Sequence, residues 1–461
     1  MQPRLLLTMT PPVYEQHRIA EKKAVRSSRH ASWQALNIIG LRKAMGRTME
    51  SIGNSRKLVI EGGQRIVDFD NKAFKPIPQA GIDLAVQAMN AGVMYRYQPK
   101  NKETSLTATL EHNFSKYMGV KHTVGTNSCG SAMFIALNIV GIQPGDKVLT
   151  NAFTFHAVPS VIQHARGEPV LVESNREWAM DPDDLDKKAT ETGAKILLMS
   201  YMRGHVPDMD AIMAVVEKHN LILIEDCAHA YATLWNGQLL GTFGEIGCFS
   251  TQSSKGLSAG EGGLFITNND EHAAKAVLYA GSYERLWTKH YDLDAELMDR
   301  LQNQIPGYSM RMQEVTAAML TPQIERLATI KKIHVENWDL LYSLLSHHPH
   351  IEIPKPLQQV DPFCDTMQFH LVDLSREQAD SFIDLMKQEG IPMQIFGARR
   401  NARDYRQWEY IQAHQDELVD TIANIEFACD LSMQPHLTQE NIRTMATVIE
   451  DVLRYITDQE A

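Results

Sequence analysis

Short apolar runs alternate with longer amphipathic stretches over residues 120–268. The apolar runs lack the period of two that marks a half-exposed strand, so each is predicted to be a strand buried on both faces. Buried strands separated by helices form a parallel sheet, and the ligands of such sheets collect at the carboxyl ends of the strands. The predicted strands are Lys147–Thr150, Pro169–Val172, Ile196–Met199 and Leu221–Ile224, and the predicted helices are Ser131–Val140, Ala157–Ala165, Asp181–Ala189 and Met209–His219.

The two ends of the chain have different patterns. A long helical stretch, Gln313–Leu345, leads into an apolar run at His370–Leu374, a helix at Glu377–Glu389 and a closing helix at Gln439–Tyr455. The first seventy residues carry recurring Lys and Arg with little apolar periodicity, which is more typical of a solvated or partner-packed extension than of a binding patch. We therefore expect a basic extension over residues 1–70, a large α/β domain with a mostly parallel central sheet over 71–325, and a smaller C-terminal α/β domain over 326–461.

Composition narrows the class of protein. The 461 residues are 44% hydrophobic and 22% charged, and the formal net charge of −11 argues against a nucleic-acid partner. The apolar stretches are interrupted well before bilayer-spanning length, and Leu5–Leu7 is too short for a signal-peptide core. Five cysteines without a Cys-x-x-Cys pair give neither a disulfide framework nor a metal site. We expect a cytoplasmic protein with no metal, nucleic-acid or membrane partner.

A single lysine, Lys255, lies in the stretch Ser-Thr-Gln-Ser-Ser-Lys-Gly-Leu-Ser-Ala-Gly-Glu-Gly-Gly at residues 250–263, between two apolar runs. Most loop lysines point into water. An amine held in a crowded, partly desolvated site can instead become a nucleophile. The stretch by itself allows both interpretations.

Two further motifs fall at predicted strand ends. Thr126–Met133 is a small-residue turn that opens a helix, so its free N–H groups and Gly130 suit a phosphate, although such a turn is also an ordinary helix cap. Asp226 ends an apolar strand, where it either caps the next helix or lies in the binding crevice beside a cation. Together with a loop lysine and the aromatic pair Phe153-Thr-Phe155, these groups match pyridoxal phosphate (PLP), which needs phosphate donors, a carboxylate at its ring nitrogen, an amine for its aldehyde and an aromatic ring over its face.

With these motifs in this order, the sequence resembles the DegT/DnrJ/StrS family of PLP-dependent aminotransferases, many of which act on nucleotide-linked keto-sugars. The resemblance runs from about residue 75 to the C-terminus. It implies the aspartate-aminotransferase fold, fold type I of the PLP-dependent transferases, and a homodimer in which the partner subunit completes each active site. The matching stretches are Cys129-Gly-Ser-Ala-Met133, Pro144-Gly-Asp-Lys-Val148, Phe153-Thr-Phe155, Asp208-Met-Asp210, Glu225-Asp-Cys-Ala-His229, Gly247-Cys-Phe-Ser250, Lys255 with Gly260-Glu-Gly-Gly263, and Gly307-Tyr-Ser-Met-Arg-Met312.

The resemblance also implies a role for each motif residue. Lys255 would form the Schiff base with the cofactor and later move the proton, Asp226 would pair with the ring nitrogen, and His229 would bond the phenolic oxygen of the ring. Phe155 would stack on the ring. The residues implied to hold the phosphate are Gly130, Ser131, Ser250 and Ser309, the last in place of an asparagine that in many relatives reaches the phosphate of the partner subunit.

The implied reaction moves an amino group from an amino acid, glutamate or glutamine, to a keto or aldehyde group of a sugar-like acceptor by a ping-pong mechanism. Two alternatives stay open: a PLP enzyme of the same fold that dehydrates or decarboxylates, and a catalytically idle regulatory homologue. Retention of Lys255 favours amino transfer, because some relatives that dehydrate carry histidine there. The stretch Tyr201-Met-Arg-Gly-His-Val-Pro207 replaces the common His-Leu-Tyr-Gly-Gln-Pro-Ala. The residues that could meet an anionic substrate, or lie at a subunit interface instead, are Arg96, Arg203, His205 and Arg311.

Overall fold

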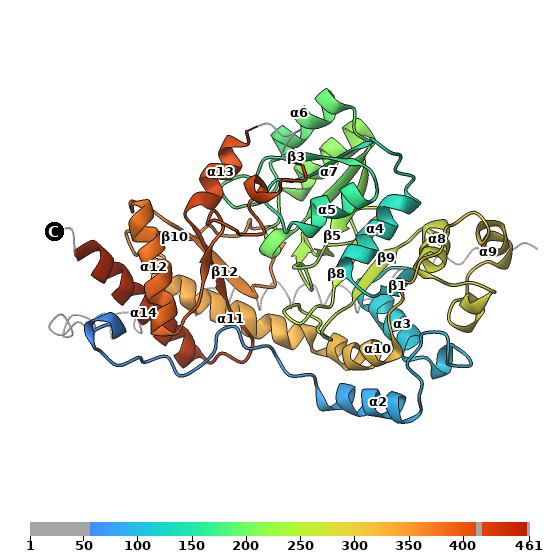
Figure 1. Cartoon of the computed structure of the whole chain (residues 1–461), viewed down its shortest axis with the longest axis horizontal. Coiled ribbons are helices and arrows are strands. Elements are labelled where there is room, and N and C mark those ends of the chain that lie inside the picture. Colours follow the sequence, from blue (N-terminus) through green and yellow to red (C-terminus); the bar gives the residue numbers. More distant parts are fainter. Residues whose placement is uncertain (1–55, 412–416, 459–461) are drawn as a thin grey trace, which may run out of the picture. The chain divides into compact units, whose positions relative to one another are not determined.

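The computed structural model describes residues 56–411 and 417–458 (Figure 1). Nearly all of the predicted basic extension, residues 1–55, lies outside the described residues. The chain from Leu58 onward forms one compact unit, and every helix and strand named below belongs to it.

A seven-stranded sheet forms the centre of the first part of this unit. Its strand order is β1–β9–β8–β5–β4–β2–β3. The neighbours from β8 to β3 pair in parallel, whereas β9 runs antiparallel to both β8 and β1. The predicted mostly parallel sheet is confirmed, and each of the four predicted strands overlaps an observed one. The strands are β1 (His122–Thr126), β2 (Lys147–Asn151), β3 (Glu168–Val172), β4 (Ile196–Ser200), β5 (Ile222–Asp226), β8 (Ile246–Ser250) and β9 (Gly263–Thr267).

Helices cover both faces of this sheet. Along β4, Ile196 and Leu198 pack into the core on one face, and Leu197 and Met199 pack into the core on the other. Burial on both faces explains why the strand reads as a continuous apolar run. One face carries α4 (Cys129–Ile139), α5 (Ala157–His164), α8 (Asp270–Ala280) and α9 (Ala295–Leu301), and the other carries α3 (Leu106–Met118), α6 (Pro182–Thr192), α7 (Met209–His219) and α10 (Glu314–Leu320).

A second, antiparallel sheet with the order β10–β12–β14–β13 lies in the C-terminal part of the chain. It has an apolar core of its own, shared with three helices and with Leu58 and Val67 from the start of the compact unit. The predicted division into domains at residues 70 and 325 stays a prediction. The elements are β10 (Ile351–Glu352), β12 (Thr366–Leu371), β13 (Gln394–Ile395), β14 (Ala428–Ser432), α11 (Leu327–Leu345), α12 (Arg376–Glu389) and α14 (Gln439–Asp458).

Two elements differ from the prediction. The single helix expected over Gln313–Leu345 is divided into α10 and α11 by a 3-10 segment, η5 (Thr321–Arg326), because Pro322 lacks the N–H group that an α-helix needs. The strand expected at His370–Leu374 begins earlier, as β12. All six residues of β12 are buried, so its sequence carries no alternation that would mark its start.

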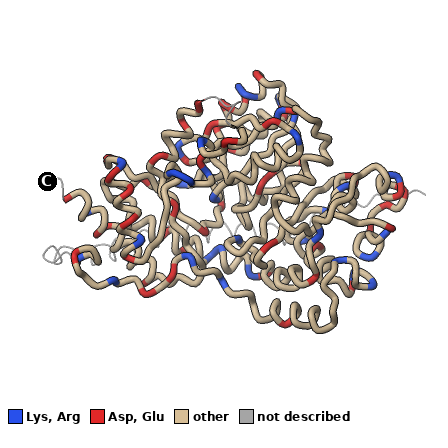
Figure 2. The backbone as a smooth tube through the Cα atoms, viewed as in Figure 1, with Lys and Arg blue, Asp and Glu red and all other residues tan. Residues whose placement is uncertain are grey.

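The remaining elements are short or connect the two sheets. They are α2 (Gln79–Asn90), α13 (Val419–Glu426), the three-stranded sheet of β6 (Leu234–Trp235), β7 (Gln238–Leu239) and β11 (Val360–Asp361), and the 3-10 turns η1 (Val59–Glu61), η2 (Lys102–Thr104), η3 (Met202–Gly204), η4 (Leu286–Lys289) and η6 (Tyr405–Gln407). Acidic and basic residues are interspersed along the described chain (Figure 2). None of the helices in the described ranges is long and apolar enough to cross a membrane.

Candidate active site

Lys255 lies in the loop between β8 and β9, beyond the carboxyl end of β8. The loop is closed by its own backbone: the Thr251 N–H donates to the Gly262 carbonyl at 2.9 Å, and the Lys255 N–H donates to the Gln252 carbonyl at 2.9 Å. Gly262 has a φ of +143°, and a Cβ there would lie 2.3 Å from Thr251 Oγ1. Only glycine fits at this position, so the glycines after the lysine allow the tight fold that positions Lys255.

The Lys255 side chain points into a cleft rather than into bulk water. Its Nζ lies 2.8 Å from Nε2 of His229. Burial, and after it the positive charge of Arg203, lowers the pKa of Lys255 to about 8. Burial and the charge of Lys255 also hold the pKa of His229 well below its usual value, so the imidazole is a neutral partner. Of the two interpretations of this lysine, the structure supports the desolvated amine.

Asp226 is the last residue of β5, and its carboxylate is fixed by three donors. Oδ2 accepts from Ser200 Oγ at 2.7 Å, and Oδ1 accepts from the Ala228 N–H at 3.1 Å and from Cys129 Sγ at 3.6 Å. Burial raises the pKa of Asp226, whereas the donors and the charge of Lys255 act in the opposite direction. No helix follows in the described residues between β5 and β6, so Asp226 is not a helix cap. A cationic group placed beside it would favour its ionised form.

The predicted phosphate seat lies at the start of α4. Ser128 caps this helix by accepting the Ser131 N–H at 3.0 Å, and Ser131 Oγ donates to Asn127 Oδ1 at 2.6 Å. A Cβ on Gly130 would meet nothing closer than Ser128 Oγ at 3.7 Å, so the space beside Gly130 is open. Gly130 and Ser250 line the cleft with Lys255, whereas Ser131 is not among its lining residues.

Phe155 is the aromatic residue of the cleft. It follows β2, lines the cleft and stays 40% exposed although it is apolar. Phe153, two residues earlier, is fully buried, with its ring 4.7 Å from that of Phe396. The motif therefore places one aromatic ring in the core and leaves the other available to a planar ligand.

Six of the eight predicted catalytic and cofactor-binding residues line this one cleft, whose cavity volume is about 580 Å³. That volume lies within the range of ordinary ligand and cofactor sites. The residues fit PLP: an amine, a carboxylate, an exposed aromatic ring and an open helix N-terminus face the same space. In addition, Nδ1 of His229 is buried and has no hydrogen-bond partner among residues 56–411 and 417–458.

The opposite wall of the cleft comes from the C-terminal part of the chain, and the sequence analysis did not identify it. Asp430 on β14, Gln394 on β13 and Arg403 in the loop after β13 line the cleft, as does Lys72. No motif marks these residues. Only the packing of the second sheet against the first brings them to Lys255, so the single available signal was the unusual run of arginines at 399–406.

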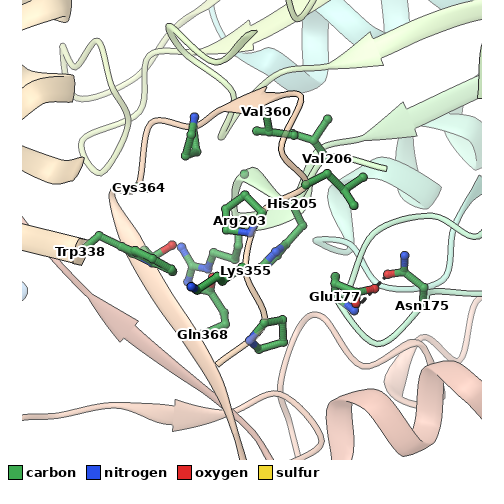
Figure 3. A pocket seen from close by; sticks show the side chains of 16 residues that line it. Asn175, Glu177, Arg203, His205, Val206, Trp338, Lys355, Val360, Cys364 and Gln368 are labelled. Atoms are coloured by element: carbon green, nitrogen blue, oxygen red, sulfur yellow. Dashed lines mark hydrogen bonds between the residues drawn. The ribbon is translucent and has the colours of Figure 1, made fainter. Parts of the chain in front are cut away.

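Arg203 and His205 lie at neighbouring cavities. Arg203 lines the Lys255 cleft and donates through Nη2 to Asp430 Oδ2 at 2.5 Å. His205 lines a second, smaller cavity that Arg203 also borders, together with Trp338, Lys355 and Gln368 (Figure 3). Burial lowers the pKa of His205 to about 4, and its ring centre lies 5.0 Å from that of Trp178. The structure therefore places Arg203, and not His205, in the cleft with Lys255.

Arg96, Ser309 and Arg311 do not line the Lys255 cleft; they border a separate surface hollow. Arg96 is only 2% exposed and donates to Glu111 Oε1 at 2.6 Å and to the Gly125 carbonyl at 3.1 Å. Arg311 donates to the Gly281 carbonyl at 2.8 Å and to Ser309 Oγ at 3.2 Å. Within one chain, these three residues are therefore apart from the catalytic candidates.

Comparisons with known proteins identify the family and the fold. The sequence profile of the DegT/DnrJ/EryC1/StrS aminotransferase family matches residues 93–450. The chain is 30% identical over 354 residues to the UDP-N-acetyl-3-dehydro-alpha-D-glucosamine 3-aminotransferase of Acidithiobacillus ferrooxidans, a match that covers 75% of this chain and 88% of that protein. It is 33% identical over 226 residues to the spore coat polysaccharide biosynthesis protein SpsC of Bacillus subtilis, covering 48% of this chain and only 57% of that relative. The X-ray structure of the aminotransferase from Psychrobacter cryohalolentis shares the fold, with a TM-score of 0.73 and 22% identity over 84% of this chain and 100% of that one.

Proposed function

The chain belongs to the DegT/DnrJ/EryC1/StrS aminotransferase family, and on that premise we propose that it is a PLP-dependent aminotransferase. It takes the amino group of an amino acid, glutamate or glutamine, and passes it to a keto or aldehyde group of a sugar or sugar-like acceptor. The two half-reactions follow one another in the same cleft. The observation that carries the proposal is that Lys255, with its lowered pKa, and the fixed carboxylate of Asp226 line this cleft together.

Lys255 supplies the amine of this chemistry. With a pKa of about 8, roughly a tenth of the side chain is neutral and nucleophilic at pH 7, compared with less than about one part in a thousand for an ordinary lysine. The neutral imidazole of His229, 2.8 Å away, can accept a hydrogen bond from the amine and hold it in place. The same Nζ is the group positioned to take and return a proton in the cleft.

Asp226 supplies the fixed negative charge. When bound, the cofactor supplies a ring that withdraws electrons from the reacting carbon, and it does so best with its nitrogen protonated. Asp226 is held by Ser200 and Ala228, so its carboxylate faces the cleft without having to reorganise. Gly130 and Ser250 would hold the phosphate, and Phe155 would cover one face of the ring.

A sugar-like acceptor is supported by the names of the relatives. One is a 3-aminotransferase of a UDP-linked keto-sugar, and another is a protein of polysaccharide biosynthesis. Activity assays with a panel of keto-sugars, using glutamate or glutamine as the donor, would identify the acceptor within this class.

The proposed enzyme is a homodimer. Ile82, Val86 and Met89 recur on one face of α2 and are 41%, 42% and 50% exposed in the single chain. An apolar face of this kind marks a protein–protein contact. Gly92 and Met94, which follow α2 in the sequence, line the hollow that contains Ser309 and Arg311, and we propose that the same partner covers it. Arg311 would then serve the active site of the partner.

The experiment that tests the function follows the bound cofactor. Purified protein with PLP should show an absorbance band near the visible edge, and glutamate should abolish the band. Borohydride reduction followed by peptide mapping should place the cofactor on Lys255. Lys75 is a matched control, because its pKa is also lowered to about 8 by burial, yet its amine donates to the Gly256 carbonyl outside the cleft. A band that survives in Lys255→Ala, or a label found on another lysine, would refute the assignment of Lys255. Detection of an aminated keto-sugar as the product would exclude dehydration and decarboxylation.

A further inference from the structure

The carboxylate of Asp430, at the wall of the cleft, accepts hydrogen bonds from three side chains. Oδ2 of its carboxylate accepts from Arg203 Nη2 at 2.5 Å and from Gln394 Nε2 at 2.8 Å, and Oδ1 accepts from Gln368 Nε2 at 2.9 Å. Both oxygens are thus occupied by donors other than Arg403. The single negative charge of Asp430 is paired with Arg203, so it cannot fully offset the positive charge of Arg403 as well.

Arg403 lines the same cleft and has no anionic partner. Within the described ranges, no carboxylate lies within ion-pair distance of its guanidinium, no side-chain hydrogen bond is formed, and Nε is buried and unsatisfied. Burial and the positive charge of Arg203 lower the pKa of Arg403 to about 10, although the negative charge of Asp430 acts in the opposite direction. The ring centre of Phe155 lies 5.7 Å from Cζ of Arg403. A partly buried guanidinium in this state is stabilised by an incoming anion.

The loop that carries Arg403 is held in place before any ligand binds. The Arg403 N–H donates to Asn401 Oδ1 at 3.1 Å, and Asn401 Nδ2 donates to the Ile395 carbonyl at 2.9 Å. The His156 N–H donates to the Ala402 carbonyl at 3.1 Å, which ties the loop to the start of α5. The backbone that carries Arg403 is therefore fixed, so the loop itself need not be ordered when a ligand binds.

We propose that Arg403, flanked by the Arg203–Asp430 pair, is the subsite for an anionic oxygen group of a substrate. The group is either the carboxylate of the amino donor or a phosphate or carboxylate carried by the acceptor. A guanidinium can bind either group through two parallel hydrogen bonds. Arg403 and Lys255 line the same cleft, so the anion would bind in the same space as the reacting amine. The inference rests on the proposed aminotransferase function.

The test uses the PLP-loaded protein and two probes that cannot react, glutarate and inorganic phosphate. Each is titrated while the absorbance of the bound cofactor and the thermal unfolding temperature are recorded, with the uncharged diamide of glutarate as a comparison. Arg403→Met should weaken binding of the preferred anion by about 10- to 100-fold, as expected for loss of a charged hydrogen-bonded pair. Arg403→Lys keeps the charge but cannot form the two parallel hydrogen bonds, so its affinity for the anion should lie between those of the wild type and Arg403→Met. Arg399→Met, an exposed arginine of the same segment that does not line the cleft, should bind as the wild type does.

The half-reactions then distinguish the two sources of the anion. If Arg403→Met raises the glutamate concentration needed for half-maximal loss of the band, the site takes the donor carboxylate. If glutamate is unaffected and phosphate binding alone is lost, the site takes the anionic group of the acceptor. The inference is overturned if the wild type binds neither probe, or if Arg403→Met and Arg403→Lys, with the cofactor band intact, bind both probes as the wild type does. Absence of the cofactor band in the wild type would instead refute the proposed function.

Discussion

Arg203 and Asp430 form an ion pair that joins the two sheets of the molecule, with 2.5 Å between Nη2 and Oδ2. Arg203 belongs to η3, just after β4 of the seven-stranded sheet, and Asp430 belongs to β14 of the antiparallel sheet. The two residues are 227 positions apart in the sequence. The pair holds a positive charge near Lys255, and this charge is one cause of the lowered pKa of the lysine.

Attachment of PLP to the cofactor-free protein should therefore depend on pH through Lys255. The neutral amine is the nucleophile, so the attachment rate should rise about tenfold per pH unit up to about pH 8 and then level. Arg203→Met removes a repelling charge, which raises the pKa of Lys255 and moves the midpoint to higher pH. Stopped-flow absorbance from pH 6 to 10, normalised to the reaction of PLP with a free lysine derivative, measures both profiles.

The lowered pKa of Lys255 also determines how the stability of the folded protein changes with pH. The pKa of Lys255 in the folded protein lies below its value of 10.5 in the unfolded chain, so the buried charge costs stability. That cost is fully present below pH 8 and is relieved as the pH rises from 8 to 10.5. If the midpoint of the attachment-rate profile does not move in Arg203→Met, the charge of Arg203 does not contribute to the lowered pKa of Lys255.

Asp226→Asn should separate cofactor binding from turnover. The amide keeps the shape and much of the hydrogen bonding but loses the negative charge, so PLP should still bind while kcat falls by about 10²- to 10³-fold, as for loss of a preorganised electrostatic group. Equilibrium binding and kcat are measured on the same preparation. A variant with nearly normal kcat would mean that Asp226 does not act on the cofactor.

Glu225 provides a matched control for Asp226, because it is the preceding buried carboxylate of the same strand. It accepts from Tyr201 Oη at 2.6 Å and from the N–H groups of Gly241, Phe243 and Gly244 at 2.7–2.8 Å, and it does not line the cleft. Glu225→Gln should lower the unfolding temperature without a selective loss of kcat in the protein that remains folded.

Complementation between inactive subunits tests the shared active site. If Arg311 acts in the active site of the partner, mixing Lys255→Ala with Arg311→Ala subunits should restore part of the activity, because a heterodimer then contains one site with both residues intact. Chain exchange is verified independently with two affinity tags. Exchange without any recovered activity would place Arg311 in its own subunit or outside the reaction altogether.

The sequence alone identified four of the seven strands of the central sheet, the catalytic candidates and the cofactor class. Buried parallel strands are apolar on both faces, so Ile196–Met199 identifies a strand without any knowledge of its neighbours. Asp226 ends β5, Lys255 lies in the loop after β8 and Gly130 lies just beyond β1. The carboxyl ends of strands that run in the same direction meet at one edge of a sheet. Local pattern and connectivity were therefore sufficient to bring these residues together.

Only the tertiary structure decided the rest of the cleft and the placement of the candidate substrate residues. Asp430, Gln394 and Arg403 reach Lys255 because the second sheet packs beside the first, and no local sequence signal encodes a contact between distant segments. Arg96 has the same residue type as Arg403, yet it is buried against Glu111, whereas Arg403 is left unpaired in the cleft. The role of an arginine depends on whether a carboxylate lies within reach of it, and that distance is set by packing rather than by sequence.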